Sequence, residues 1–224
     1  MRPIKIRARL IMLGLLIQLL FLVPQAVAAQ APLPDEMQAA GLTIITVNST
    51  TDPGNGTCDT TECTLREAIA NVVANGTINF NLPLPAKITL VAGQLVLDKS
   101  LTIQGPGADQ LAIWGSNARV LYVTGQNILL QGITIREGRT GVDPGPGIYN
   151  TGLLTIRNSV ITENRITTGQ YGVHGGGIYN AGSGVLSLDN TTVSENFATQ
   201  NGGGLANVED GTVYIKYSGF IHNL

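Results

Sequence analysis

Apolar and polar residues alternate in short runs along most of the chain, and each run stops at glycine or asparagine. Leu154 and Ile156 are separated by a polar residue, and Leu186 and Leu188 repeat this spacing. A period of two is typical of a strand with one buried face. No run with helical spacing exceeds one turn after Gly76. The pattern therefore predicts short β-strands joined by tight turns.

The strands belong to a repeated unit. The segment GIYNTGLLTIRNSVITEN begins at Gly147, returns as GIYNAGSGVLSLDNTTVSEN at Gly177 and returns more loosely as GLANVEDGTVYIKYSGFIHN at Gly204, so the starts lie 30 and 27 residues apart. A unit of this size made of strands and bends is one coil of a β-solenoid, whose coils stack as parallel strands about 4.8 Å apart. We interpret residues 99–107 and 127–138 as the first coils.

The glycine-rich stretch HGGGIYNAGSG, residues 174–184, fits either a phosphate-binding loop or a bend of the solenoid. A phosphate-binding loop occurs once per site and ends in Gly-Lys-Ser or Gly-Lys-Thr. Here the glycines recur from unit to unit, and no such ending follows. We therefore interpret the stretch as a bend of the repeated coil.

Stacked coils place equivalent residues in columns along the solenoid. Asparagine side chains in such a column hydrogen-bond to one another and to the backbone of the bend. A column of alternating charge is typical of a solvent-facing ladder. We expect an apolar core column (Ile148, Ile178, Leu205), two structural asparagine ladders (Asn150, Asn180, Asn207; Asn164, Asn196, Asn223) and one charge ladder (Arg157, Asp189, Lys216).

The strongest helical signal outside the leader lies in CTLREAIANVVANG, residues 63–76. Thr64 and Glu67 have the spacing of a capping box, and Asn75-Gly76 supplies a stop. The apolar residues that share one helical face are Leu65, Ala68, Ile69, Val72 and Val73. We expect an amphipathic helix that caps the N-terminal end of the solenoid, where bare strand edges would otherwise pair with other chains. A helix of a separate small domain is the alternative.

The first residues predict export. Four of the first nine residues are basic, an apolar run follows from Leu10 to Val23, and AVA at 26–28 supplies the small residues of a cleavage site. An uncleaved membrane anchor is the alternative, which the shortness of the apolar run disfavours. We expect a protein that is secreted or held at the cell surface, with a signal peptide over residues 1–28, a linker over 29–43, an N-terminal cap over 44–76 and β-helix repeats over 77–224 that are cut short at the C-terminus.

Charge and cysteine content narrow the function. Without residues 1–28 the chain keeps nine basic and 15 acidic residues, a formal net charge of −6. Such a chain lacks the clustered Lys and Arg that nucleic-acid binding needs. Cys58 and Cys63 are the only cysteines, and export favours a disulfide between them. We expect no cofactor. Calcium is an alternative, because three acids lie near the cysteines, although their spacing matches no EF-hand loop: Asp52, Asp59 and Glu62.

The segment ECTLREAIANVVANGTINF, residues 62–80, resembles the motif of the CSLREA-domain family, with Thr64 in place of the serine. Such domains precede β-helical repeats in exported bacterial surface proteins. Gly176-Gly177-Ile178 and Phe220–Asn223 resemble the GGAI-like and FxxN motifs of polymorphic outer-membrane proteins. At the level of the fold, the chain resembles the pectin-lyase-like proteins, and this resemblance implies an all-β, right-handed parallel β-helix.

Two sets of residues are candidates for function. Glu163 and Glu195 occupy equivalent positions with His222 and are weak catalytic candidates, because carboxylates on adjacent strands have a separation near that of retaining glycosidases. We favour solvated edge residues over a sugar or cation site here. Tyr149 and Tyr179 stack and are weak ligand-binding candidates, since exposed aromatic rings bind sugars through their apolar faces. Covering of the sheet is the interpretation that we favour for these tyrosines.

The remaining residues favour a protein without catalysis. His174 and His222 are the only histidines and belong to different coils, Trp114 is expected to pack, and no catalytic triad, zinc signature or cofactor loop stands out. Our leading hypothesis is an adhesin-like surface protein, a non-catalytic scaffold that binds polysaccharides or host cell-surface glycans. The alternatives are an extracellular polysaccharide lyase or glycoside hydrolase, and a structural spacer. We expect no nucleic-acid partner, and membrane attachment only through the export signal or a missing C-terminal anchor.

Overall fold

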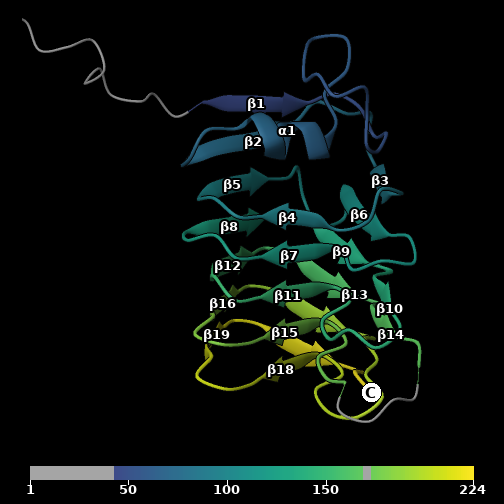
Figure 1. Ribbon diagram of the computed structural model, residues 1–224, viewed down its shortest axis with the longest axis vertical. Coiled ribbons are helices and arrows are strands. Elements are labelled where there is room, and N and C mark those ends of the chain that lie inside the picture. The colour runs from purple at the N-terminus through teal and green to yellow at the C-terminus, as the bar shows by residue number, and fades with distance from the viewer. Residues whose placement is uncertain (1–42, 169–172) are drawn as a thin grey trace, which may run out of the picture. The chain divides into compact units, whose positions relative to one another are not determined.

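The computed structural model describes residues 43–168 and 173–224. In this part of the chain, the strands form a parallel β-solenoid of about five turns, whose coils stack one below another (Figure 1). The predicted solenoid is thus confirmed. The predicted signal peptide, residues 1–28, lies outside the described residues, as does the predicted linker except for Thr43.

The longest side of the solenoid is a seven-stranded parallel sheet. Its strands, in spatial order, are β1 (Ile44–Val47), β2 (Gly76–Phe80), β5 (Leu101–Gln104), β8 (Ile128–Gln131), β12 (Leu153–Arg157), β16 (Val185–Asp189) and β19 (Thr212–Lys216). Arg157 lies beside Asp189, which lies beside Lys216, and Arg157 Nε is 3.7 Å from Asp189 Oδ2. The charge ladder therefore faces outward on this sheet.

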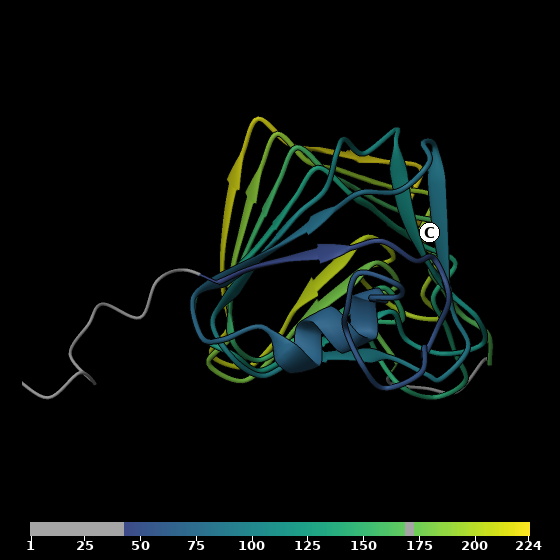
Figure 2. The same ribbon diagram turned by 90° about the horizontal axis from the view of Figure 1, so that it is seen from above.

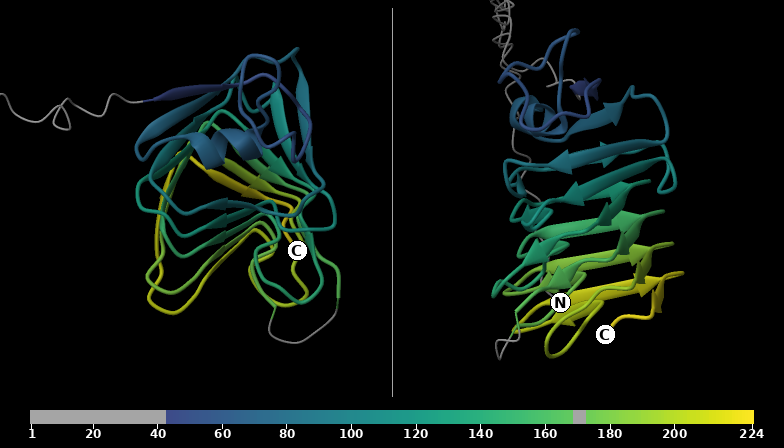
Figure 3. Two further views of the ribbon diagram at one scale, coloured as in Figure 1. Left: turned by 45° about the horizontal axis from the view of Figure 1, so that its top comes forward. Right: turned by 90° about the vertical axis from the view of Figure 1, so that its right-hand side faces the viewer.

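Two further parallel sheets complete each coil, and the three sheets surround the core (Figures 2 and 3). The six-stranded sheet consists of β3 (Ala86–Leu90), β6 (Leu111–Gly115), β9 (Thr134–Arg136), β13 (Val160–Thr162), β17 (Thr192–Ser194) and β20 (Gly219–Ile221). The five-stranded sheet consists of β4 (Leu95–Leu97), β7 (Leu121–Val123), β11 (Ile148–Asn150), β15 (Ile178–Asn180) and β18 (Leu205–Asn207). A short pair, β10 (Arg139–Thr140) and β14 (Arg165–Ile166), extends two coils.

The first turn of the solenoid precedes residues 99–107 and, apart from Gly76, lies within the range 77–224 that we assigned to the repeats. The first full turn is formed by β2, β3 and β4, so residues 99–107 belong to the second turn and their interpretation as the first coil is wrong. The prolines of NLPLPAKITL, residues 81–90, interrupt the alternation and conceal this turn in the sequence.

The core follows from the alternation within each strand. Ile148 lies beside Ile178, which lies beside Leu205, and the first two side chains are fully buried. In the five-stranded sheet the asparagine ladder completes this core, because Asn150 Nδ2 donates to Asn180 Oδ1 and Asn180 Nδ2 donates to Asn207 Oδ1, each over 2.7 Å. Stacked amides thus satisfy the buried polar groups at the ends of β11 and β15.

The helix α1 (Leu65–Asn71) is shorter than predicted. Its capping box is confirmed, since Glu67 N donates to Thr64 Oγ1 and Thr64 N donates to Glu67 Oε2. Val72 is already extended and Val73 is 45% exposed, so the expected continuation to residue 76 is wrong. Two successive β-branched residues favour extended backbone, and the chain must there turn into β2.

The segment around α1 is tied to the first turn by polar contacts. Arg66 pairs with Asp52 through Nε and Nη2, at 2.7 and 3.1 Å, and also donates to the carbonyl oxygens of Gly93 and Gln94. A disulfide joins Cys58 to Cys63. The sequence CTLREA therefore supplies a disulfide, a helix cap, two core residues and an ion pair at this end of the solenoid.

Candidate functional site

The glycine-rich stretch is a bend whose backbone donors are occupied. The N–H groups of Gly175, Gly176, Gly177 and Ile178 all donate to carbonyl oxygens of the following coil, over 2.8 to 3.2 Å. A side chain at Gly176 would meet backbone atoms closer than the 3.0 Å that real Cβ atoms respect. A phosphate would need these N–H groups for itself, so the stretch serves the packing of coils rather than anion binding.

A second column of turns carries the candidate carboxylates. Each of the strands β9, β13, β17 and β20 is followed by one polar residue with left-handed backbone, at φ of 51–55°. We call this column of side chains the acid column; it consists of Glu137, Glu163, Glu195 and His222. This conformation is uncommon for residues other than Gly, Asn and Asp. The acid column therefore projects one polar side chain from each coil at the same place.

The residues after the acid column hold the turn in place. Asn164 Nδ2 donates to Asn196 Oδ1 over 2.9 Å, and Asn196 Nδ2 donates to Asn223 Oδ1 over 3.0 Å. Asn164 and Asn196 are buried. Each buried amide fixes the backbone from which the preceding acid projects, so the acid column stands on a rigid support.

Two of the three carboxylates of the acid column are ion-paired. Glu163 pairs with Arg136 of β9, and Glu137 Oε2 accepts from Arg139 Nη2 over 2.6 Å. In the described residues, Glu195 has no ion-pair partner. Glu163 and Glu195 follow adjacent strands in register and stand side by side on one face. Carboxylates of a glycosidase flank the bond that they cleave from two sides, and this arrangement does not.

A groove of about 340 Å³ runs along the acid column. Its other wall is the next column of the same turns, in which Arg139 lies beside Arg165 and Arg165 lies beside Phe197. The Arg165 guanidinium is 4.9 Å from the centre of the Phe197 ring. We call this hollow the turn groove; it is lined by Glu137, Arg139, Glu163, Arg165, Glu195, Asn196, Phe197, His222 and Leu224.

The second candidate site is a row of tyrosines on the outer face of the five-stranded sheet. Tyr122, Tyr149 and Tyr179 occupy adjacent strands in register, with ring centroids 5.3 Å apart and ring planes tilted by 33° and 34°. All three side chains are half-buried. The pKa values of Tyr149 and Tyr179 are raised, chiefly by burial and then by the neighbouring tyrosine. The hydroxyls therefore stay protonated and can donate as well as accept hydrogen bonds.

Arg119 holds the tyrosine row from one side. Its guanidinium lies 5.1 Å from the Tyr149 ring and donates to Gln94 Oε1 and to the carbonyl oxygens of Pro144 and Gly145. Burial lowers the pKa of this guanidinium. Arg119 thus links three successive coils and fixes the face on which the rings stand.

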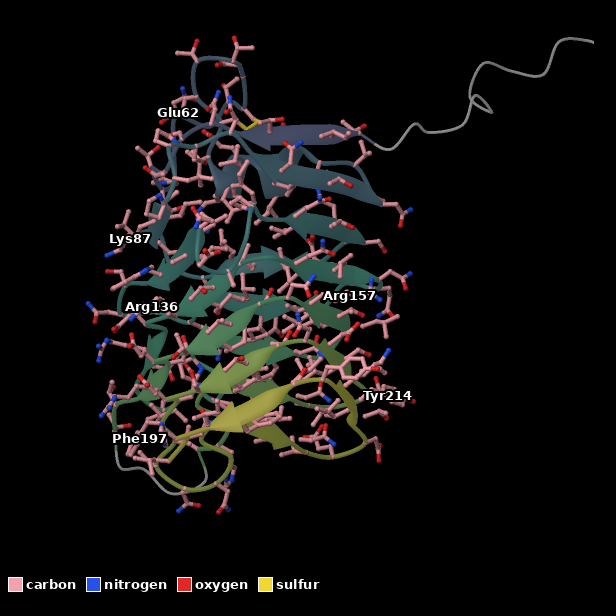
Figure 4. All side chains as sticks on the ribbon, turned by 180° about the vertical axis from the view of Figure 1, so that it is seen from behind. Glu62, Lys87, Arg136, Arg157, Phe197 and Tyr214 are labelled. Atoms are coloured by element: carbon pink, nitrogen blue, oxygen red, sulfur yellow. A yellow bond between two sulfur atoms is a disulfide. The ribbon has the colours of Figure 1, made fainter. Side chains whose placement is uncertain are left out.

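Trp114 packs on the outer face of the six-stranded sheet between two cations. Lys87 Nζ lies 3.5 Å and Arg136 Cζ lies 4.6 Å from the centre of its ring. Figure 4 shows Lys87, Arg136 and Phe197 along one edge of the solenoid, whereas Arg157 and Tyr214 lie along the other. Trp114 is therefore connected to the turn groove through Arg136 and Glu163.

The acids named as possible calcium ligands are engaged elsewhere. Asp52 pairs with Arg66, Asp59 Oδ1 accepts from the N–H groups of Thr61 and Glu62, and Glu62 Oε1 accepts from Thr51. Among residues 43–168 and 173–224, no group of three or more His, Cys, Asp or Glu side chains is placed to hold a metal ion.

Sequence reasoning found part of each site. It named Glu163, Glu195, Tyr149 and Tyr179, but missed Tyr122, Arg119 and most of the turn groove. Tyr122 was detectable, because Leu-Tyr-Val at 121–123 has the same alternation as Ile-Tyr-Asn at 148–150. The residues that sequence reasoning did not name are Tyr122, Arg119, Glu137, Arg139, Arg165 and Phe197.

No helix within the described part of the chain is both long and apolar enough to cross a bilayer. Comparison with protein-family models, with curated proteins and with solved structures finds no match to this chain. The chain is accordingly identified by its architecture, a parallel β-solenoid of about five turns with repeated polar and aromatic columns on its outer faces.

Proposed function

We propose that the chain is an exported, right-handed parallel β-helix of the CSLREA-domain kind, which binds glycans along its side as part of an adhesin-like surface protein. The observation that carries the proposal is the row of Tyr122, Tyr149 and Tyr179, one ring per coil at 5.3 Å intervals. A linear glycan is itself a repeat of similar units. When it lies along the solenoid, it meets the same aromatic edge and hydroxyl at each step.

The N-terminal segment supports the export and capping parts of the proposal. The pattern of basic, apolar and small residues at 1–28 is that of a secretory signal, and the Cys58–Cys63 disulfide suits an oxidising compartment. The motif residues Leu65 and Ala68 are fully buried, and Glu67 is nearly so. A motif used in this way fits an end cap better than a catalytic centre.

Binding is favoured over catalysis by the state of the acid column. Glu163 and Glu137 are neutralised by arginines, and the carboxylates stand side by side on one face. An acid catalyst of a glycosidase needs a carboxyl group that stays protonated, which a neighbouring guanidinium opposes. A polysaccharide lyase or glycoside hydrolase remains the alternative that an activity assay decides.

The proposal is tested by binding of the secreted chain to a glycan array. We expect retained binding to linear glycans, which falls at least about tenfold when Tyr149 and Tyr179 are both replaced by alanine, since two aromatic contacts are lost. Tyr214→Ala is the matched control, because Tyr214 is exposed on the seven-stranded sheet. Absence of any bound glycan contradicts the proposal. Release of sugars from a polysaccharide panel that is lost in the double variant Glu163→Gln, Glu195→Gln supports the enzyme instead.

A further inference from the structure

The turn groove differs in chemistry between its two ends. Near β9 and β13, the acids Glu137 and Glu163 are neutralised by Arg139 and Arg136. Near β17 and β20, Glu195 and His222 stand opposite Phe197 and Leu224. In the described residues, the side chains of Glu195 and His222 form no hydrogen bond or ion pair with the protein. The second end therefore offers free polar groups on one wall and apolar surface on the other.

Arg165 lies between the two ends of the groove. Its side chain is exposed, and its guanidinium stacks on Phe197 without a carboxylate partner among residues 43–168 and 173–224. Stacking on an aromatic ring orients a guanidinium while leaving its N–H groups free to donate. Arg165 can therefore offer these donors to a ligand that rests on Phe197.

We infer that the turn groove binds one pyranose residue of a glycan chain, with Glu195 accepting from sugar hydroxyls, Arg165 donating to sugar oxygens and Phe197 packing against the C–H face. A pyranose carries hydroxyls at its rim and C–H groups on its faces, and so matches a groove with one polar and one apolar wall. A carboxylate accepts hydrogen bonds at both oxygens, which suits neighbouring hydroxyls. This inference rests on the proposed function and adds to it a second, separate contact site.

Other occupants fit the groove less well. A divalent cation needs several oxygen ligands, and the described residues contain no group of three or more side chains placed for one. The groove also lacks the net charge that would attract a strongly charged ligand. Arginines already neutralise Glu137 and Glu163, and the unpaired groups are one carboxylate, Glu195, and one guanidinium, Arg165. A neutral sugar is the ligand that uses all the free groups of the groove.

The test uses the full secreted chain, three neutral hexasaccharides (cellohexaose, chitohexaose and xylohexaose) and hexagalacturonate as the charged comparison, which is expected to bind more weakly. Binding is measured by calorimetry and by the fluorescence of Trp114, the only tryptophan, which contacts Arg136 and through it Glu163. We expect at least one neutral hexasaccharide to bind and to change this fluorescence. Binding of hexagalacturonate alone would overturn the neutral-sugar site. Glu195→Gln keeps the size of the side chain and is expected to weaken binding at least about tenfold, the usual effect of losing a charged acceptor.

The controls separate this inference from the proposed function. Asp189→Asn, on the seven-stranded sheet, is the matched removal of a carboxylate and is expected to leave binding unchanged. Binding that is lost in Tyr149→Ala and unchanged in Glu195→Gln overturns the turn-groove site and leaves the proposed function intact. Binding that requires added calcium overturns the sugar site in favour of a cation site. No binding to any hexasaccharide or array glycan overturns both.

Discussion

The two ends of the solenoid are built from the same columns but are shielded very differently. Ile78 and Ile215 belong to one core column of the seven-stranded sheet, in which Ile78 is covered by Ile45 of β1 and Ile215 lies in the last strand, β19. Ile88 and Phe220 lie at opposite ends of a core column of the six-stranded sheet. Ile78 and Ile88 are fully buried, whereas Ile215 is 52% and Phe220 is 42% exposed. Identical alternation in the sequence thus leads to opposite burial, and the difference must come from residues outside the repeat.

A non-repeating segment packs against the core at the N-terminal end. β3 is the first strand of its sheet, yet Ile88 is as buried as any residue of a middle coil. Leu65, Ala68 and Val72 belong to the same hydrophobic cluster. We propose that α1, which stands outside the repeat, covers the core at this end.

The largest expected effect is at this protected end. Leu65→Ala is expected to lower the free energy of unfolding by about 2–5 kcal/mol, because it leaves a cavity beneath α1. Phe220→Ala, at the exposed end, is expected to cost no more than about 1 kcal/mol, since the ring already meets solvent. Urea denaturation followed by circular dichroism measures both. Equal losses in the two variants would contradict the asymmetry between the ends.

A smaller effect is expected within the asparagine ladder. Asn196→Ala removes the acceptor of the N–H and Nδ2 groups of the buried Asn164 and the donor to Ile161 O and Asn223 Oδ1. We expect a loss of about 1–3 kcal/mol. Asn223→Ala, in the last coil, is the matched control and is expected to cost less, since Asn223 is only half-buried. Thermal unfolding of the two variants side by side ranks them, and a larger loss in Asn223→Ala would refute the ladder's dependence on burial.

The periodic part of the fold was predictable from the sequence, because register in stacked coils follows from equal spacing. Ile148 beside Ile178, and Asn150 beside Asn180, follow from the repeat alone. The first turn could not be found in this way, since prolines break its alternation. The sequence also did not predict where α1 ends. Val72 and Val73 leave the helix because the chain there turns into β2, and such a tertiary constraint has no local sequence signal.

The candidate sites were less predictable than the coils. Glu137 was not predicted because Gly138 follows it, whereas an asparagine follows Glu163 and Glu195, so the turn lacks the residue that marks the motif. Arg119 lies outside the strands, and most of its partners are backbone carbonyls of a later coil, which no sequence pattern marks. The turn groove combines two columns separated by a buried asparagine. Only the conformation of the bend places both columns on one surface.

The smallest expected effect is a loss of stability at acid pH, which we expect from two buried carboxylates at the N-terminal end, Glu67 and Asp52. Burial alone would raise the pKa of Glu67, but hydrogen bonds from Thr64, Gly56 and Asn55 lower it overall. The pKa of Asp52 is likewise lowered, as hydrogen bonds from Arg66, Ala92 and Val91 outweigh its burial.

Both carboxyls bind protons more weakly in the folded state than in the unfolded state. Their contribution to stability is therefore complete above their ordinary pKa values, 4.5 for Glu67 and 3.8 for Asp52. It is lost as the pH falls through the lower pKa values of the folded state. The melting temperature of the chain is therefore expected to drop between pH 5 and pH 3 by roughly a few degrees, and this drop is expected to be shallower in Glu67→Gln. Asp98→Asn, at an exposed position, is expected to leave the slope unchanged. An unchanged acid slope in Glu67→Gln would mean that the protected end does not depend on this carboxylate, and that the hydrophobic contacts of α1 alone distinguish it from the exposed end.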